Sequence, residues 1–307
     1  MITYNPKSWF SLIFAIHRTG TFRNLFWVMF IMGFYSAGLN WLFHQYLEKN
    51  LPRTIVLHSL LGLAISLLLV FRTNTAYERW WEGRRLWGTL LNVSRMLAVR
   101  LHSFLGNSHH NDKVYFSRMF SNFALALKEH LRDSADAAFL KYGSEEELIE
   151  WKTSSHIPNT LIKNIYERIN SHYKEGVLSG EQLIILDSDL KELCNILGSC
   201  ERIKSTPIPY SYSLFLKKII FVYVMSLPFS LIGDYGYWSS LIVPFVLYVF
   251  AGLELLAEEI EDPFGLDDND IPTDRIAERL RQNVEEILLG KSTMQDSQAG
   301  SGENFLK

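Results

Sequence analysis

Residues 57 to 91 pass from apolar to polar sequence without a break, and this strongly constrains the fold. The apolar part ends in LeuLeuLeuValPhe at position 71. The chain then continues directly into ArgThrAsnThrAlaTyrGluArgTrpTrp, with no proline to end a helix. We therefore expect a membrane-spanning helix that runs straight into an aromatic, arginine-rich cytoplasmic helix.

An apolar stripe occupies one face of this expected helix. Leu63, Leu67 and Phe71 recur every four residues, which on a helix gives a stripe about 12 Å long. Such a stripe either packs on a neighbouring helix or, around a symmetry axis, forms apolar rings that gate ions by dewetting. Four helices fill their own interior with side chains, so a pore would need several copies of the chain.

The composition fits a protein that is partly in a membrane and partly in water. Of the 307 residues 48% are apolar, 14% aromatic and 21% charged, with a net charge of -3. Four apolar spans are expected, at 25–43, 55–71, 219–232 and 238–256. The third is the weakest, because Lys217 and Lys218 precede it and Pro228 lies inside it. The predicted fold class is an all-α integral membrane protein with four transmembrane helices and a large helical cytoplasmic region.

The basic residues near the span ends predict the orientation. Lys and Arg gather before the first span, after the second and before the third, which places these ends inside and both termini in the cytoplasm. The predicted segments are an N-terminal interfacial helix at 1–24, the first two transmembrane helices at 25–71, a helical cytoplasmic region at 72–210, two further transmembrane helices at 211–257, an acidic turn and cytoplasmic helix at 258–290, and a disordered tail at 291–307.

The cytoplasmic region reads as a series of amphipathic helices. Residues 75–105 form one of them, and others are expected at 114–131, 145–151, 161–173 and 181–203. Ser144 with Glu147 and Ser179 with Gln182 match the capping-box pattern, which predicts two helix starts.

Three separate stretches of the sequence resemble the bestrophin family. Residues 71–84 contain the characteristic triplet Arg79, Trp80 and Trp81. ProIleProTyrSerTyr at 207–212, with Pro207 and Pro209, precedes the third span, and Asp262, Pro263, Phe264 and Gly265 follow the fourth. The resemblance covers residues from about 20 to 290 and is greatest to the shorter bacterial and plant-type members.

The resemblance implies a homopentameric channel for small monovalent ions. In the family, the positions of Leu63, Leu67 and Phe71 form a hydrophobic neck in the pore. A second constriction lies near the cytoplasmic exit, for which Ile184, Ile185 and Leu190 are the candidates here. Animal and plant bestrophins are typically chloride or anion channels, whereas bacterial members can conduct monovalent cations, so both selectivities stay open.

The residues just after the neck are the candidates for selectivity. Glu78 follows Phe71 by seven positions, almost two turns, so a ring of Glu78 would favour cations. Alternatively Glu78 pairs with Arg79, Arg85 or an arginine of a neighbouring copy. A ring of Arg72 would favour anions, but Arg72 is rotated roughly 100° from the stripe. Asn74 is the third candidate beside the neck.

An acidic run follows the fourth span. Asp262, Asp267, Asp268 and Asp270 could supply oxygen ligands to calcium. The run lacks the glycine of an EF-hand loop, and Leu266 stands where the calcium clasp of animal bestrophins has its first acidic residue. A solvated acidic cap is the alternative. Calcium is the only cofactor suggested, and none is required.

The sequence gives little support for catalysis or nucleic-acid binding. The nine histidines show no metal-binding spacing, and His109 and His110 are expected to be solvated in a polar turn. We therefore predict a channel rather than an enzyme, with a membrane scaffold or transporter as the alternative class. The expected partners are further copies of the chain, the lipid bilayer and permeant monovalent ions. The expected location is a membrane, the inner membrane if the source is a bacterium.

Overall fold

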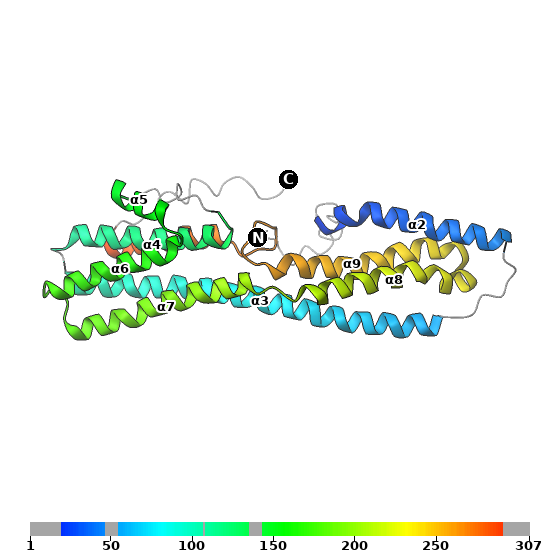
Figure 1. The fold of residues 1–307 in the computed structure, drawn as a ribbon, viewed down its shortest axis with the longest axis horizontal. Helices are drawn as coiled ribbons and strands as arrows, with labels where there is room; N and C mark the ends of the chain where they lie inside the picture. Colours follow the sequence, from blue (N-terminus) through cyan, green and yellow to red (C-terminus); the bar gives the residue numbers. More distant parts are fainter. Residues whose placement is uncertain (1–19, 47–54, 107, 135–142, 291–307) are drawn as a thin grey trace. The chain divides into compact units, whose positions relative to one another are not determined.

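The computed structural model describes residues 20–46, 55–106, 108–134 and 143–290, and these residues form helices joined by short turns (Figure 1). Most of the predicted interfacial helix at 1–24 and the whole predicted tail at 291–307 lie outside the described residues. The helices are α2 (Gly20–Tyr46), α3 (Ile55–Leu105), α4 (His110–Leu131), α5 (Glu145–Thr153), α6 (Ile157–Lys174), α7 (Gly180–Ser205), α8 (Tyr210–Tyr235), the 3-10 helix η3 (Gly236–Trp238), α9 (Ser239–Glu261) and α10 (Thr273–Leu289).

The chain divides into two compact units. The first, called here the apolar unit, comprises residues 1–81, 207–263 and 267–270. The second, called the polar unit, comprises residues 82–206, 264–266 and 271–307. Helix α3 is continuous and contributes to both units, as the unbroken sequence predicts.

The apolar unit contains the stretches that are long and apolar enough to cross a membrane. Three were found among the described residues, Leu25–Tyr46, Ile55–Leu105 and Tyr210–Glu261. The last contains α8 and α9, which lie side by side because the chain turns back at η3 (Figure 1). The start of this turn needs Gly236, whose φ of 52° is strained for any residue with a Cβ.

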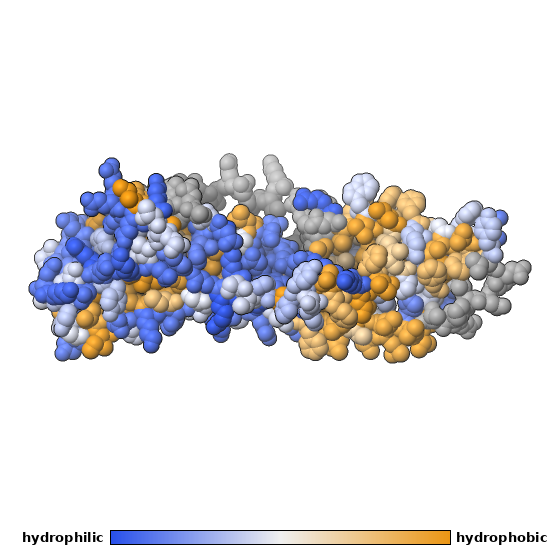
Figure 2. All heavy atoms as spheres, viewed as in Figure 1, coloured by the Kyte–Doolittle hydropathy of each residue, from blue (hydrophilic) through white to orange (hydrophobic). Residues whose placement is uncertain are grey.

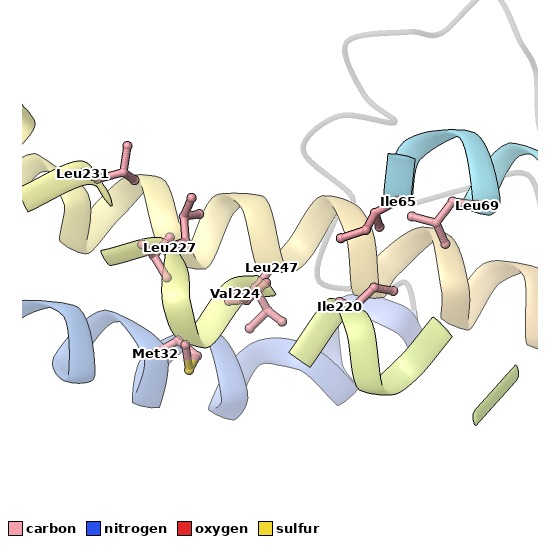
Figure 3. Close-up of a cluster of buried hydrophobic side chains, with 9 residues drawn as sticks. Met32, Ile65, Leu69, Ile220, Val224, Leu227, Leu231 and Leu247 are labelled. Atoms are coloured by element: carbon pink, nitrogen blue, oxygen red, sulfur yellow. The ribbon is translucent and has the colours of Figure 1, made fainter. Parts of the chain in front are cut away.

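The core of the apolar unit joins α3 to α2, α8 and α9 (Figure 3). Ile65 and Leu69 of α3 are fully buried there, among Met32 of α2, side chains of α8 and Leu247 of α9. At Gly62 the Tyr223 side chain of α8 lies against the α3 backbone, and a Cβ there would lie 2.8 Å from the Tyr223 hydroxyl. This close packing fixes which face of α3 looks inward.

The outer surface of the apolar unit is largely hydrophobic, as Figure 2 shows over these helices. Trp27, Phe34, Phe221, Leu241 and Phe245 are among its exposed large side chains. A water-soluble protein rarely exposes so much contiguous apolar surface. Together with the helix lengths, this surface indicates a membrane protein.

The polar unit is a set of amphipathic helices around Trp87, Leu97, Phe116, Phe120 and Phe123, all fully buried. Both predicted capping boxes are confirmed. Ser144 accepts a hydrogen bond from the Glu147 backbone and starts α5, and Ser179 accepts one from Gln182 and starts α7. In each box the side chain of the third residue also bonds back to the cap, which satisfies two helix-end donors.

Candidate functional site

The apolar stripe of α3 points away from its own protomer. Leu63, Leu67 and Phe71 are 70%, 56% and 57% exposed. On the opposite face of the same helix, Ile65 and Leu69 are 0% and 1% exposed. The stripe therefore does not pack against another described helix of the chain, so the described residues give no support to packing of the stripe within one chain.

The exposed face of α3 continues beyond the apolar stripe. Asn74 and Glu78 follow it at helical spacing and are exposed, so the face from Leu63 to Glu78 extends roughly 22 Å along the helix. Glu78 has no hydrogen-bond or ion-pair partner among the described residues. Arg79 instead donates to the Glu261 backbone carbonyl at 3.1 Å. The alternative in which Glu78 pairs with Arg79 or Arg85 of its own chain is thus not seen in the described part of the structure.

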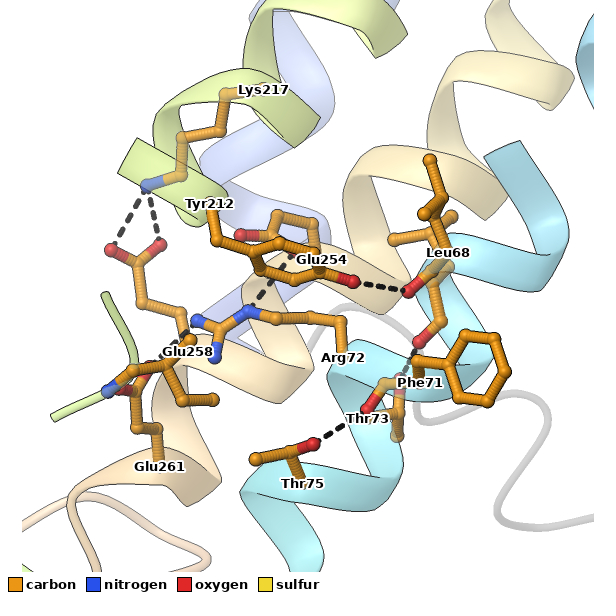
Figure 4. Close-up of polar contacts among 12 residues, drawn as sticks. Leu68, Phe71, Arg72, Thr73, Thr75, Tyr212, Lys217, Glu254, Glu258 and Glu261 are labelled. Carbon is orange, nitrogen blue, oxygen red and sulfur yellow. Dashed lines mark hydrogen bonds and ion pairs between the residues drawn. The ribbon is translucent and has the colours of Figure 1, made fainter. Parts of the chain in front are cut away.

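Arg72 does not belong to this exposed face, although the sequence made it a selectivity candidate. Its side chain is 1% exposed and forms ion pairs with Glu261 at 2.7 Å and Glu254 at 3.5 Å. Figure 4 shows the guanidinium between the two carboxylates and the Phe71 ring turned away from them. The single-residue step between Phe71 and Arg72 rotates the side chain by about 100°, from the exposed face into the protomer. Arg72 is therefore a structural cation and not an exposed ring residue.

Glu261 and its neighbours at the end of α9 connect several segments of the apolar unit. Glu261 accepts a hydrogen bond from the Ile208 backbone N–H at 2.6 Å. Close by, Tyr212 donates to the Leu68 carbonyl at 3.1 Å and Lys217 pairs with Glu258 (Figure 4). The polar end of α9 thereby holds both the start of α8 and the turn of α3 that carries Phe71.

The motif residues that carry the family resemblance meet in space. Trp80 donates its indole N–H to the Asn269 carbonyl at 2.9 Å, and Arg79 binds Glu261 as described above. Pro209 is the residue before α8 and Pro207 is exposed near it. Trp81 is half-exposed. These contacts hold the chain after α9 against α3.

The segment after Asp262 belongs partly to the polar unit and packs tightly there. The Phe264 side chain is buried beside Gly83, where a Cβ would lie only 3.1 Å from the ring. Arg132 donates to the Phe264 carbonyl at 3.3 Å. Pro263 is also buried, whereas Asp262 is exposed and Gly265 half-buried. The pattern AspProPheGly is thus a packed turn.

The three candidates for a cytoplasmic constriction differ in their placement on α7. Ile184 and Ile185 are exposed, and the Ile185 carbonyl accepts from Arg100 at 3.3 Å. Leu190, however, is 2% exposed and belongs to the core of the polar unit. The prediction of Leu190 was therefore wrong, because six positions beyond Ile184 turn the side chain about 120° around the helix, from the exposed face into the core. Ile184 is the best placed of the three.

The acidic turn does not gather its carboxylates around one point. Asp262, Asp267 and Asp268 are exposed and Asp270 is buried. Among the described residues, two groups of three metal-type side chains have donor atoms within 4.8 Å of one another, and neither includes this turn. Calcium takes six to eight oxygens, so calcium binding here stays a prediction that the side-chain positions do not strengthen.

Asp270 is the unusual member of the turn. One oxygen accepts from the Asp267 backbone N–H at 2.7 Å and the other has no partner in the described residues. Burial, aided by the nearby charges of Asp267, Asp262 and Glu259, raises the pKa of Asp270 to about 7. A buried, half-satisfied carboxyl group is most stable when protonated.

A pH dependence of stability follows from this carboxyl group. Because its folded-state pKa lies above the ordinary 3.8, it stabilises the fold at low pH and the contribution is lost as pH rises from about 4 to about 7. We expect the thermal unfolding temperature of Asp270→Asn to be higher than that of the wild type at pH 8 and to approach it toward pH 5. The measurement is thermal unfolding in detergent with EDTA present. The exposed neighbour provides the control, since Asp268→Asn should follow the wild type at every pH. A constant difference between Asp270→Asn and wild type would contradict the assignment.

The polar residues inside the apolar helices have partners within the protomer. His58 contacts the Ser226 hydroxyl at 3.1 Å, and Ser66 donates to the Gly62 carbonyl at 2.8 Å. Asn40 donates to Ser239 and to the Gly236 carbonyl. The His58 and Asn40 contacts join helices, whereas the Ser66 bond lies within α3, and in the described part of the chain these groups form no polar site for a transported solute.

Comparison with known proteins identifies the family. The family described as Bacterial/Fungal Bestrophin protein matches residues 1–286 of the sequence. The chain belongs to the bestrophin family. A voltage-dependent anion channel-forming protein of Nostoc sp. is 30% identical over 99% of both chains. The voltage-dependent anion channel-forming protein YneE of Escherichia coli is 32% identical over 91% of both chains.

Solved bestrophin structures share the fold. A bacterial bestrophin homolog from Klebsiella pneumoniae matches with a TM-score of 0.81 at 30% identity, covering 85% of this chain and 97% of that one. This agreement confirms the family resemblance that was inferred from the motifs at 71–84, 207–212 and 262–265.

Two residues important to this bestrophin were not singled out in the sequence. These residues are Glu254, near the end of the fourth predicted span, and Glu261, shortly after that span. Glu254 lies four residues before Glu258 in an otherwise apolar helix, and an ionisable residue in such a position usually has a partner. That rule would have suggested a buried cation, although not which one.

Proposed function

We propose that this bestrophin is the subunit of a homopentameric channel that conducts anions passively, with the Leu63, Leu67 and Phe71 side chains of each copy forming a hydrophobic neck on the axis. The family and the names of its relatives are those of ion channels and not of enzymes. The relatives named above are called anion channel-forming proteins, which is why anions are the first choice.

The exposed stripe on α3 carries the proposal. Its three large apolar side chains cost free energy in water, and the buried core on the opposite face prevents α3 from turning them inward. A lipid-facing stripe would also account for these residues, since the predicted span ends at residue 71, and the pore is preferred because the relatives are channel-forming proteins. A face that runs from apolar to polar suits a pathway that leaves a narrow neck and widens into water.

The topology that goes with the proposal has four membrane spans. Helices α8 and α9 would each cross once, joined at η3 on the outer side, so that both chain termini lie in the cytoplasm. The Lys and Arg residues near the span ends favour this orientation. In a bacterium the membrane would be the inner membrane. Conduction of this kind requires no cofactor.

A cation-selective pore of the same architecture is the second candidate. The observation that favours it is Glu78, exposed and without a partner among the described residues. Five such carboxylates near one axis would attract cations and repel chloride. A scaffold or transporter is a third candidate, which the hydrogen bonds of His58, Ser66 and Asn40 within the apolar unit do not favour.

The deciding experiment is current through a planar bilayer containing purified protein under a KCl gradient. A reversal potential near the equilibrium potential of chloride supports the proposed anion channel. A reversal potential near the equilibrium potential of potassium supports the cation alternative. Absence of current from protein shown to be inserted would contradict both. The subunit number is measured separately, by native mass spectrometry or by counting bleaching steps of labelled subunits.

Replacing Glu78 tests its role in selectivity. We expect Glu78→Gln to shift the reversal potential toward chloride, because removal of the carboxylate charges lowers the local cation concentration. Glu286→Gln changes an exposed carboxylate on α10 instead and should leave the potential unchanged. A reversal potential that does not move in Glu78→Gln would place Glu78 outside the pathway, in an ion pair with a neighbouring copy.

A further inference from the structure

Two histidines and an aspartate come together in the polar unit where α4 begins and α6 ends. His109 Nδ1 lies 3.3 Å from one carboxylate oxygen of Asp112, and His172 Nε2 lies 3.3 Å from the other. The donor atoms of all three residues are within 4.8 Å of one another. We propose that His109, Asp112 and His172 bind a divalent transition metal ion, zinc(II) in the first place.

Each histidine nitrogen lies 3.3 Å from its own oxygen of Asp112, a separation that fits neighbouring ligands of one metal ion held by both carboxylate oxygens. With bonds of about 2.0–2.1 Å to nitrogen and oxygen, tetrahedral ligands of zinc are separated by roughly 3.3 Å. The hydrogen-bond range for N–H···O is about 2.7–3.2 Å, so 3.3 Å is long for a bond to an ionised carboxylate. Two imidazoles and one carboxylate leave a fourth position for water, a donor set that zinc accepts.

His172 provides independent evidence for a bound ligand, because contacts with the described part of the protein do not satisfy its ring nitrogens. Its side chain is 3% exposed, and neither ring nitrogen has a hydrogen-bond partner among the described residues. The approaches of this ring to Asp112 and Glu175 are ion-pair contacts without hydrogen-bond geometry, and a buried imidazole that makes no hydrogen bond costs free energy. Because His172 Nε2 faces Asp112, a metal ion bound to Asp112 would accept the lone pair of this nitrogen.

Glu175 and Arg168 contact two of the proposed ligands and can orient them, as neighbouring residues usually do in a metal site. The other ring nitrogen of His172, Nδ1, lies 3.9 Å from a Glu175 carboxylate oxygen, where it can present its proton. Ligating histidines usually direct their second N–H to such an acceptor. Arg168 donates to Asp112 Oδ1, which holds the carboxylate and leaves Oδ2 on the His109 side. His109 is the most exposed of the three and provides the side from which an ion enters.

The alternative is that Asp112 is only a polar anchor for Arg168 at the start of α4. Arg168 already neutralises the carboxylate, and its positive charge opposes a nearby cation. Arg168 is about half-exposed, however, so solvent screens this repulsion. The anchor also leaves the buried His172 unexplained, and for this reason the metal site is preferred.

A second group with metal-type side chains, His130, His156 and Glu201, does not fit a metal equally well. Both imidazoles contact one Glu201 oxygen, at 2.8 and 2.6 Å, which are ordinary hydrogen-bond lengths. His156 Nδ1 also accepts the Asn159 backbone N–H and caps α6. The proton of a neutral His156 must therefore be on Nε2, so this nitrogen donates to Glu201 and has no lone pair for a metal. The group is self-sufficient and serves as the internal control.

The test uses full-length protein in detergent, freed of its purification tag and treated with EDTA. Zinc(II) is titrated by calorimetry, and cobalt(II) is added separately to look for the visible absorption of a tetrahedral site. We expect one zinc ion per chain in the wild type. Affinity should fall at least about tenfold in His109→Gln and His172→Gln, and roughly tenfold in Glu175→Gln. His130→Gln and His110→Gln should bind like the wild type.

His109→Gln is the decisive variant because its half-exposed site tolerates the change, whereas His172→Gln alters the core. Circular dichroism shows whether each variant is folded. The proposal is overturned if the wild type binds no stoichiometric zinc or if folded His109→Gln binds with unchanged affinity. It is equally overturned if zinc binding is lost in His130→Gln instead. None of these outcomes depends on ion conduction, so the inference stands or falls apart from the proposed channel.

Discussion

Single-channel conductance is expected to rise severalfold when Leu63, Leu67 and Phe71 are replaced together by alanine. If these side chains form the proposed neck, their truncation in every copy widens it and removes the surface that excludes water. Because these side chains are 56–70% exposed in the protomer, the change should cost little protomer stability. The measurement is current through planar bilayers at equal protein density.

A matched control lies on the same helix. Leu57 and Leu61 are also exposed large side chains in the apolar part of α3, but they are turned roughly 100° from the middle of the stripe. Leu57→Ala with Leu61→Ala should leave the conductance unchanged. If this pair raises the conductance as much as the triple change, or if the triple change has no effect, the stripe is a packing surface toward lipid or a neighbouring copy and the pore assignment is wrong.

Much of the helical framework could be predicted because its signals are local. The unbroken sequence from Leu57 to Leu91 predicted one continuous helix, and α3 is continuous from Ile55 to Leu105. The capping boxes at Ser144 and Ser179 predicted the starts of α5 and α7. The position of the apolar stripe on one face followed from helical periodicity alone.

The partners of charged residues could not be predicted in the same way. Arg72 and Glu261 are 189 positions apart in the sequence, and periodicity shows only which way Arg72 points relative to Phe71. The same limit applies to His109. It was expected to be solvated like its exposed neighbour His110, yet it contacts Asp112 beside a histidine from another helix. Contacts of this kind depend on how helices pack, which no spacing within one helix reveals.

The candidate site was predicted in part. Leu63, Leu67 and Glu78 could be assigned to one face from helical spacing, and the structure shows that this face is exposed, whereas Ile65 and Leu69 are buried. Leu190 was misplaced because the choice between Ile184, Ile185 and Leu190 rested on resemblance and not on the helical phase of α7. Asp270 was grouped with its acidic neighbours, although the turn buries it and leaves them in solvent.

Loss of the Arg72 cation should be the most damaging single change in the apolar unit. Arg72 is 1% exposed and Glu254 is 3% exposed, so Arg72→Met leaves a buried carboxylate without its nearest positive charge. Removal of one partner of a buried ion pair costs about 3–5 kcal/mol. We expect a large fall in the thermal unfolding temperature of detergent-solubilised protein.

Two further variants separate charge from packing. Arg85→Met changes an exposed arginine of the same helix and should alter the unfolding free energy by no more than about 0.5 kcal/mol. Arg72→Met combined with Glu254→Gln removes the orphaned charge and should recover part of the lost stability. If Arg72→Met is no less stable than Arg85→Met, the ion pairs do not hold α3 to α9.

The position of Arg72 connects this stability to conduction. It follows Phe71 directly, so the ion pairs with Glu254 and Glu261 fix the turn of α3 that presents the last ring of the proposed neck (Figure 4). When that anchor is lost, Phe71 should no longer be held at one rotation about the helix axis. Folded Arg72→Met channels should therefore show more variable conductance levels than wild type, and the Glu254→Gln combination should not restore them, because it removes the orphaned charge without replacing the anchor. A uniform, wild-type conductance in both variants would show that packing of Ile65 and Leu69 alone sets the orientation of Phe71.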